Sequence, residues 1–420
     1  MRDLSTRGIT QAPYGRLANG QAITQFTLTN ANGLVAKIID FGGIITELHA
    51  PDRDGRFADV VLGFDSLDGY EGENPYFGAL IGRYGNRIAH GRFTLDGREV
   101  VLPANDGAHH LHGGPGGFHK VTWHASVEGD SLVLAYRSVD GEQGYPGNLD
   151  ATVRYQLNDA NELVVRFEAV TDKPTPVNLT QHSYFNLAAD GEKGGDILDH
   201  LLTIDADTFV GIDAASIPLG TLSPVTGTPF DFRTPRPIGE RVSQPDKQLR
   251  HGQGYDHNFV LNKPNGKEMT RAAHVLEPGS GRVLELFTEE PGVQFYSGNF
   301  LDGSLAGKGR SYGHRSGFCL EPQHFPDSPN QPHFPNVILR PGQVYQTESR
   351  FRFSVQGEGT SAGWSPSSTS ATNWASACCG ANARGACCGP TSRPRRCGRT
   401  RHPVAGASAG GCRSACVRSR

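Results

Sequence analysis

The segment VRYQLNDANELVVRFEA, residues 153–169, decides the fold class that the sequence predicts. Apolar side chains occupy every second position on both sides of a polar interruption at residues 158–161. Successive side chains of a β-strand point to opposite faces, so a period of two predicts two strands that each bury one face. The polar interruption is typical of a turn, and the whole segment is therefore expected to form a β-hairpin.

The same alternation recurs outward from this hairpin in both directions. Residues 93–101 contain an Asp96-Gly97 pair of the kind that favours a tight hairpin turn. Further alternating runs are expected to form strands at residues 131–136, 201–209 and 283–287. No long amphipathic helix and no repeat of fixed period is found, and 54 Gly and 27 Pro suit many short strands joined by turns. The sequence predicts an all-β protein, a large antiparallel β-sandwich that forms one domain over residues 8–355.

Composition excludes several classes of partner. The net charge of −3 gives no electrostatic reason to expect nucleic acid. The first ten residues lack the apolar core of a secretory signal, and no run of about 18 apolar residues suggests a membrane span. Residues 1–355 contain a single cysteine, Cys319, which fits a reducing compartment. We therefore expect a cytoplasmic protein without membrane partners.

Residues 356–420 differ in composition from the rest of the chain. They hold seven of the eight cysteines, nine Arg, no Lys and one acidic residue, Glu358. Their net charge is therefore +8, against −11 for the remainder. With little apolar periodicity they are not expected to pack into a core. A shifted reading frame, an unstructured extension, and a redox or anion-binding tail all remain open explanations.

Histidines gather in two motifs of the predicted domain. NDGAHHLHGG, residues 105–114, carries His109, His110 and His112 on a glycine-rich loop. Functional residues are often placed on such loops, although solvated histidines would look the same. NLTQHSYFNL, residues 178–187, carries His182 among aromatic residues, where a satisfied core histidine is the alternative to a catalytic one.

Carboxylates occupy two further motifs. GYDHNF, residues 254–259, pairs Asp256 with His257, and taken alone indicates a turn. FCLEPQHFPD, residues 318–327, places Glu321 in an apolar stretch, either at an exposed strand end or partly buried. Burial would raise the pKa of that glutamate and favour a role as general base.

Two segments offer polar groups that suit sugar hydroxyls. GRYGNRI, residues 82–88, carries Arg83 and Arg87, which could equally be ordinary surface charges. VQFYSGNF, residues 293–300, carries Gln294 among aromatic side chains that suit the apolar face of a pyranose. HExxH and phosphate-loop motifs are absent from the sequence, and the loop histidines lack further ligands at metal-binding spacing. We therefore expect neither a metal nor a cofactor.

Taken together and in order, these motifs resemble the aldose 1-epimerase (galactose mutarotase) family. The resemblance also includes IDFGGIIT (39–46), DVVLGFD (59–65), GFHKVTW (117–123) and LRPG (339–342), and it covers about residues 10–353. It implies a galactose mutarotase-like supersandwich with an open carbohydrate cleft. Two departures are His109, where members often carry Asn, and residues 356–420, which are foreign to the family domain.

The resemblance implies a mutarotase that interconverts the α and β anomers of free hexoses such as glucose and galactose. Glu321 would be the general base at the anomeric hydroxyl, His182 the general acid at the ring oxygen, and His112 a second site histidine. The sugar hydroxyls would be bound by Asn86, Arg87, Asp256 and Gln294. Ring opening needs only one base and one acid on either side of the hemiacetal, so it requires no metal and no cofactor.

Three alternative functions remain open at this level. A non-catalytic sugar-binding module need not keep both Glu321 and His182. An epimerase for phosphorylated hexoses would need additional cations at the rim of its cleft. A glycoside-processing enzyme would need two carboxylates about 5–10 Å apart, such as Asp256 and Glu321. The sequence does not decide which sugar is preferred, and it is compatible with a monomer or a weak homodimer.

Overall fold

The computed structural model describes residues 7–189 and 195–356, and β-strands are the main regular secondary structure of these residues. The ladders within the large sheets run antiparallel, which confirms the predicted all-β sandwich. The α-helices of the described residues are short, namely α1 (Leu67–Glu71) and α2 (Lys247–Gly252). None of the helices in this part of the chain is long and apolar enough to cross a membrane. The tail predicted at residues 356–420 lies outside the described residues from residue 357 onward.

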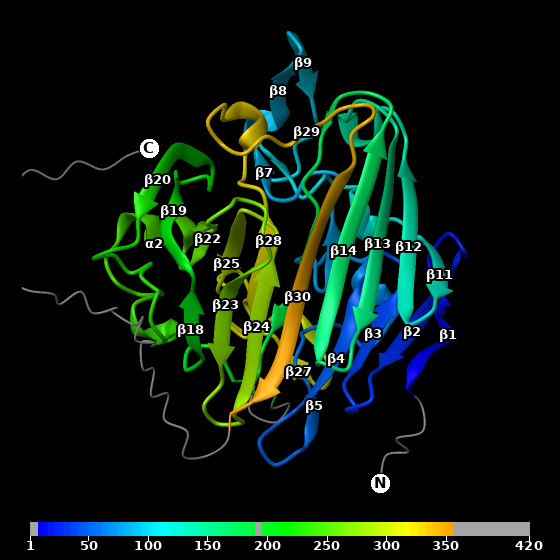
Figure 1. Ribbon diagram of the computed structural model, residues 1–420, viewed down its shortest axis with the longest axis vertical. Coiled ribbons are helices and arrows are strands. Elements are labelled where there is room, and N and C mark those ends of the chain that lie inside the picture. Colours follow the sequence, from blue (N-terminus) through cyan, green and yellow to red (C-terminus); the bar gives the residue numbers. More distant parts are fainter. Residues whose placement is uncertain (1–6, 190–194, 357–420) are drawn as a thin grey trace, which may run out of the picture. The chain divides into compact units, whose positions relative to one another are not determined.

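The largest sheet has nine strands, most of which run side by side across Figure 1. Its strands in spatial order are β11 (His124–Glu128), β12 (Ser131–Ser138), β13 (Leu149–Leu157), β14 (Glu162–Thr171), β30 (Tyr345–Val355), β24 (Arg282–Thr288), β23 (Thr270–Leu276), β18 (Leu201–Ile204) and β21 (Arg236–Pro237). The hairpin expected at residues 153–169 is the β13–β14 pair, in which Val153 lies opposite Phe167 and Tyr155 opposite Val165. All four side chains are buried, as their alternation predicted.

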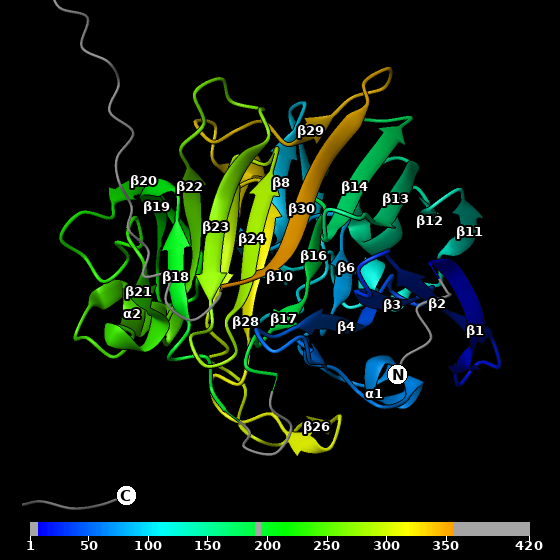
Figure 2. The same ribbon diagram turned by 60° about the horizontal axis from the view of Figure 1, so that its bottom comes forward.

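Two smaller sheets complete the architecture. A six-stranded sheet consists of β17 (Tyr184–Phe185), β28 (Phe318–Gln323), β25 (Gly292–Tyr296), β22 (Asp256–Leu261), β19 (Ala206–Ile212) and β20 (Pro218–Pro224). A five-stranded sheet consists of β1 (Gly8–Arg16), β2 (Ala22–Thr29), β3 (Val35–Ile39), β4 (Ile45–Pro51) and β5 (Phe57–Asp59). In Figure 2 the blue strands β1–β4 lie near the β11–β14 end of the nine-stranded sheet.

One hydrophobic core joins the three sheets. It includes Ile38 from β3, Val165 from β14 and Phe295 from β25, each completely buried. Burial of apolar surface contributes about 25 cal/mol per Å², so a shared core of this size ties the sheets into one unit. The rigid unit fixes the loops and short strands that emerge from it.

Short two-stranded ladders carry several residues of interest. They pair β7 (Arg87–Ile88) with β10 (His110–Leu111), β6 (Ala79–Ile81) with β16 (Thr180–His182), β8 (Arg92–Leu95) with β9 (Arg98–Val101), β15 (Thr175–Pro176) with β29 (Ile338–Leu339), and β26 (Ala306–Gly307) with β27 (Arg310–Ser311). The β8–β9 pair confirms the hairpin expected around Asp96-Gly97.

The single strand expected at residues 201–209 is wrong. The run divides at Asp205 into β18 of the nine-stranded sheet and β19 of the six-stranded sheet. Apolar alternation continues across the division because both strands bury one face, so periodicity alone does not reveal a change of sheet. The Asp205 carboxylate accepts a hydrogen bond from Arg271 at 2.9 Å, which fixes the crossing point.

Candidate active site

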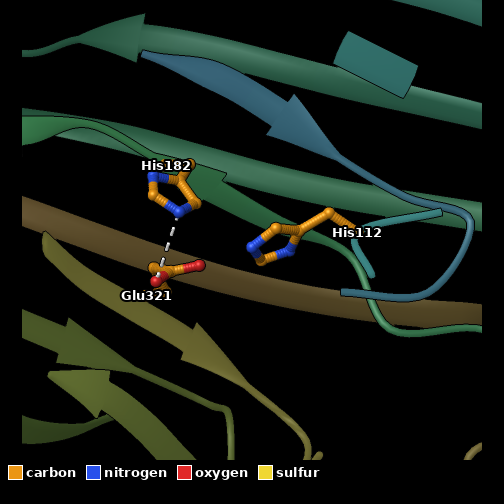
Figure 3. Close-up of side chains that lie close together, drawn as sticks. All are labelled: His112, His182 and Glu321. Carbon is orange, nitrogen blue, oxygen red and sulfur yellow. Dashed lines mark ion pairs between the residues drawn. The ribbon is translucent and has the colours of Figure 1, made fainter. Parts of the chain in front are cut away.

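Glu321, His182 and His112 come together in the folded chain from three distant segments (Figure 3). His182 Nε2 lies 3.6 Å from Glu321 Oε1, and the two imidazole rings are 5.1 Å apart between centroids. The three residues are 2%, 5% and 6% exposed in that order, so they form a nearly dry cluster with a small open surface. Their proximity agrees with the roles implied by the family resemblance, although it does not test those roles.

Neighbouring strands of the six-stranded sheet position Glu321 and its polar partners. Glu321 on β28 lies opposite Gln294 on β25, which lies opposite Asn258 on β22. Gln294 Nε2 donates a 2.8 Å hydrogen bond to Asp256 Oδ1. Because Asp256 begins β22, the turn suggested by its motif alone is wrong. Strand pairing thus gathers Asp256, Gln294 and Glu321 at one place.

His182 is held by ring packing and by a contact at one nitrogen. It ends β16, opposite Ala79 of β6. Its ring stacks on that of Tyr184 with a centroid separation of 5.2 Å and an interplanar angle of 29°. Cys319 Sγ lies 3.6 Å from His182 Nδ1. These contacts leave Nε2 as the nitrogen that faces Glu321.

His112 is fixed by reciprocal hydrogen bonds to the backbone of Asn86. The Asn86 N–H donates to His112 Nδ1 at 3.0 Å, and the His112 N–H donates to the Asn86 carbonyl at 3.1 Å. Since Nδ1 accepts, the neutral imidazole carries its proton on Nε2. The loop then turns at Gly113, where φ is 82° and an added Cβ would lie 1.8 Å from the Gly82 carbonyl oxygen. Glycine is therefore required directly after His112.

Arg87 is oriented by a carboxylate that the sequence reasoning missed. Arg87 Nε donates to Asp106 Oδ2 at 2.7 Å, and the Arg87 side chain is 13% exposed. The Arg87 N–H donates to the Asn86 side-chain oxygen, which links the two residues predicted to bind sugar. Asp106 stands within the histidine-rich loop motif, and its nearness in sequence to His112 was the only available signal.

Burial dominates the electrostatics of the cluster. It raises the pKa of Glu321 well above the usual value, the charge of Asp256 raises it further, and Arg87 opposes both. It also raises the pKa of Asp256, against the opposing effects of Arg87 and Gln294. Burial lowers the pKa of His182 to about 4 and that of His112 well below its usual value. The empty cluster therefore favours neutral imidazoles and a carboxyl that readily holds a proton.

Two acceptor oxygens in this cluster are buried without a hydrogen-bond partner, Glu321 Oε2 and Gln294 Oε1. A buried acceptor without a partner costs about 1–3 kcal/mol, so such atoms in a folded protein call for an explanation. The two residues lie opposite each other across β28 and β25. A ligand that donates several hydroxyl hydrogens would satisfy both oxygens together.

Other residues singled out in the sequence lie outside this cluster. Arg83 is 1% exposed and donates to backbone carbonyls of a neighbouring loop. His110 is buried, and its Nε2 lies 2.7 Å from the Tyr145 hydroxyl. His257 packs among aromatic rings of the core, and His109 accepts a backbone hydrogen bond. These residues support the fold. The alternatives of a surface charge for Arg83 and of a solvated histidine for His110 are therefore wrong, because both side chains are buried and hydrogen-bonded.

The cluster does not fit a metal ion, although ligand atoms of Glu321, His182 and His112 lie within 4.8 Å of one another. A metal on His112 Nε2 would require the ring proton on Nδ1. That proton would point at the Asn86 N–H, which already donates to Nδ1. The tautomer fixed by Asn86 is therefore the wrong one for metal binding at this site.

Comparison with known proteins points to one family. The sequence profile of the aldose 1-epimerase family matches residues 24–352. A galactose mutarotase from Bos taurus is 49% identical over 348 residues, which are 83% of this chain and 99% of that protein. An aldose 1-epimerase from Escherichia coli K12 is 42% identical, over 80% of this chain and 97% of that protein.

Solved structures give the same result. An aldose epimerase homologue from C. elegans has a TM-score of 0.73 and 32% identity, over 78% of this chain and 98% of its own. A galactose 1-epimerase from Lactobacillus acidophilus has a TM-score of 0.72 and 28% identity, over 83% of this chain and 99% of its own.

Proposed function

The chain belongs to the aldose 1-epimerase family and is a mutarotase of aldoses, and we propose that Glu321 and His182 exchange the two protons of the reaction. Glu321 removes the proton from the hydroxyl on C1, and His182 delivers a proton to the ring oxygen. The C1–O5 bond breaks as the C1 carbonyl forms, the aldehyde rotates about C1–C2, and closure on its other face returns both protons. The contact of 3.6 Å between His182 Nε2 and Glu321 Oε1 carries this assignment.

Glu321 and His182 share one proton, and in the active state this proton is on His182. Burial favours the neutral pair in the empty site, because it raises the pKa of Glu321 and lowers that of His182. A sugar hydroxyl that donates to Glu321 stabilises the carboxylate, and the proton then moves to the imidazole. A small free-energy difference between the neutral pair and the carboxylate–imidazolium pair suits a reaction that runs in both directions.

His112 acts as a neutral donor in this proposal. Its Nδ1 accepts from Asn86, so its Nε2–H is free to donate to the ring oxygen or to an adjacent hydroxyl. Asp256, Gln294, Arg87 and the Asn86 segment bind the remaining hydroxyls. The unpartnered oxygens of Gln294 and Glu321 support a polyhydroxyl substrate over an apolar one.

The charges near Glu321 favour an uncharged monosaccharide over a phosphorylated one. The charged groups that act on its pKa are Asp256 and Arg87, and Arg87 is already paired with Asp106 at 2.7 Å. A phosphate would bring about two negative charges to a place where a carboxylate is disfavoured.

We also propose that the chain works in the cytoplasm, as a monomer or weak homodimer and without nucleic acid. Cys319 is free and buried, which suits a reducing compartment. Residues 1–355 have a net charge of −11, which offers no attraction for a polyanion.

Polarimetry tests the proposed function directly. Fresh α-D-glucose and α-D-galactose are followed with and without the protein, in the presence of a chelator. We expect faster relaxation to an unchanged final rotation, and the two rates rank the sugars. A correctly folded protein that accelerates neither sugar would contradict the proposal and favour a phosphosugar epimerase or a binding module.

A further inference from the structure

Tyr76 contacts three imidazoles, two of which belong to the site, although no motif in the sequence singled it out. Its ring centroid lies 4.7 Å from that of His112, 4.7 Å from that of His119 and 5.7 Å from that of His182. The first two contacts are edge-to-face, at 69° and 71°. Edge-to-face geometry is favourable for aromatic pairs and restricts the rotation of both rings. Tyr76 itself is partly exposed, so its ring separates the buried imidazoles from solvent.

The backbone at Tyr76 is in a conformation that is costly for this residue type. Its φ is 64°, in the left-handed region that bulky side chains rarely adopt. Asn86 and His112 also have positive φ, of 64° and 50°. Such residues cost about 1–3 kcal/mol each and gather at functional sites, where the surrounding structure holds them in place. Tyr76 therefore has a positive φ in common with Asn86 and His112, the two residues whose hydrogen bonds fix the tautomer of His112.

Hydrogen bonds on both sides of Tyr76 hold the strained conformation. The Phe77 N–H donates to the Asn74 side chain at 3.3 Å, and the Ala79 N–H donates to the Tyr76 carbonyl at 3.1 Å. The Gly78 N–H donates to the His182 carbonyl at 3.0 Å. The segment that carries Tyr76 is thus tied directly to the segment that carries His182.

From this packing we propose that Tyr76 is a positioning residue, whose ring fixes the imidazole planes of His112 and His182 toward the sugar. The inference rests on the proposed function, because it assigns Tyr76 to the same site. The contacts are made by the ring and not by the hydroxyl, so the ring carries the effect. Burial raises the pKa of Tyr76 to about 12, so the phenol adds no negative charge at neutral pH. A displacement of about 1 Å can cost about 100-fold in rate, which makes such support significant.

Three variants separate the ring, the hydroxyl and the packing. Tyr76→Leu removes the ring, and Tyr76→Phe removes only the hydroxyl. Tyr14→Leu is the matched control, since Tyr14 packs against the same apolar cluster, is partly exposed, and also has a pKa raised to about 12. We expect Tyr76→Leu to lower kcat by about 10–100-fold with a smaller change in KM. Tyr76→Phe should restore most of that kcat, and Tyr14→Leu should keep it.

A spectroscopic measurement adds a second readout at the imidazoles themselves. The imidazole ¹⁵N signals of His112 and His182 should shift in Tyr76→Leu and stay close to wild type in Tyr76→Phe and Tyr14→Leu. If Tyr76→Leu does not fold, Tyr76→Met replaces it with the same expectation.

Two outcomes would overturn the proposal. One is a Tyr76→Leu protein with wild-type kcat and unmoved imidazole signals. The other is a Tyr76→Phe protein as impaired as Tyr76→Leu, which would transfer the role to the hydroxyl. Either result leaves the proposed function intact, whereas a wild-type protein without mutarotation contradicts the proposed function itself.

Discussion

Glu321 is a buried carboxyl whose second oxygen lacks a protein partner. A group of this kind weakens the folded state, because water would solvate it better than the protein does. The same surroundings raise its pKa, which brings the carboxyl closer to the range in which a general base works at neutral pH. Burial of Glu321 is therefore the common cause of its proposed chemistry and of its cost to the stability of the fold.

Glu321→Gln tests that link at the scale of a single residue. We expect kcat to fall by about 10²–10⁴-fold, since an amide does not accept the proton from the C1 hydroxyl. We expect thermal stability to be equal or higher at neutral pH, because the carboxyl with its raised pKa favours the unfolded state, in which it ionises, and the amide does not. Polarimetry and thermal denaturation measure the two effects.

Glu348→Gln is the control for Glu321→Gln. Glu348 is 5% exposed and buried in the nine-stranded sheet, where it is paired with Arg166 and Arg350. This variant should lose stability and keep its kcat. A Glu321→Gln protein that turns over at the wild-type rate would remove Glu321 from the mechanism.

At the scale of elements, strand pairing determines which polar residues meet. β22, β25 and β28 are neighbours in one sheet, and their register places Asp256, Gln294 and Glu321 close together. The charge of Asp256 raises the pKa of Glu321, so the two carboxyls are electrostatically coupled through this pairing. The sheet thereby adjusts the pKa of the proposed base, Glu321, as well as holding the residue in place.

Asp256→Asn tests the coupling between these strands. Removing the negative charge should lower the pKa of Glu321, so the rise of kcat/KM with pH should move to lower pH. Loss of a charged hydrogen bond to a sugar hydroxyl should raise KM by about tenfold or more. Asp205→Asn removes a half-exposed carboxylate outside the site and should change neither quantity. An unmoved pH profile for Asp256→Asn would show that the two carboxyls are not coupled.

The elements differ in how far the sequence could predict them. The β13–β14 and β8–β9 hairpins were predicted correctly because alternation and turn residues are local signals. The division at Asp205 was missed because both halves alternate in the same way. The structural roles of Arg83 and His110, and the contacts of Tyr76, depend on residues far away in sequence. Such contacts leave no periodic pattern, so only the family resemblance singled out the two histidines that the fold brings next to Glu321.

At the scale of the whole molecule, buried histidines link folding to pH. Burial lowers the pKa to about 4 for His110, His182 and His200. It lowers the pKa to about 3 for His119 and His257. The unfolded chain takes up protons at a pKa of about 6.5, whereas the folded chain does not until pH is near 4 or below. The unfolded state therefore binds more protons in this interval, and stability must fall as pH falls through it.

We expect the free energy of unfolding to decrease between about pH 6.5 and 4 by up to about 1.4 kcal/mol per pH unit for each such histidine. The raised pKa values of Glu321 and Asp256 act in the opposite direction, but they are fewer. Urea denaturation at several pH values measures the slope. The variant His257→Phe should reduce the slope of the unfolding free energy against pH. The variant His124→Gln, at an exposed position, should leave this slope unchanged. Stability that is constant across this interval would show that these histidines are not held neutral by the fold.

The boundary of the domain is the last question at this scale. β30 pairs with β14 on one side and β24 on the other, and its register with β24 runs to Val355. The Gln356 N–H then donates to the Gly281 carbonyl. The family match ends at residue 352, and the bovine relative is covered over 99% of its length by 83% of this chain. These observations favour a domain that is complete at residue 356.

A chain shortened to residues 1–356 should therefore keep its mutarotase kcat and its melting temperature. A chain shortened to residues 1–344 loses all of β30, which contributes Phe351 and Phe353 to the core between two strands, and should not fold. Polarimetry and thermal denaturation of both proteins give the answer. If the 1–356 protein lost activity while remaining folded, residues 357–420 would have a part in the reaction, and the proposed boundary would be wrong.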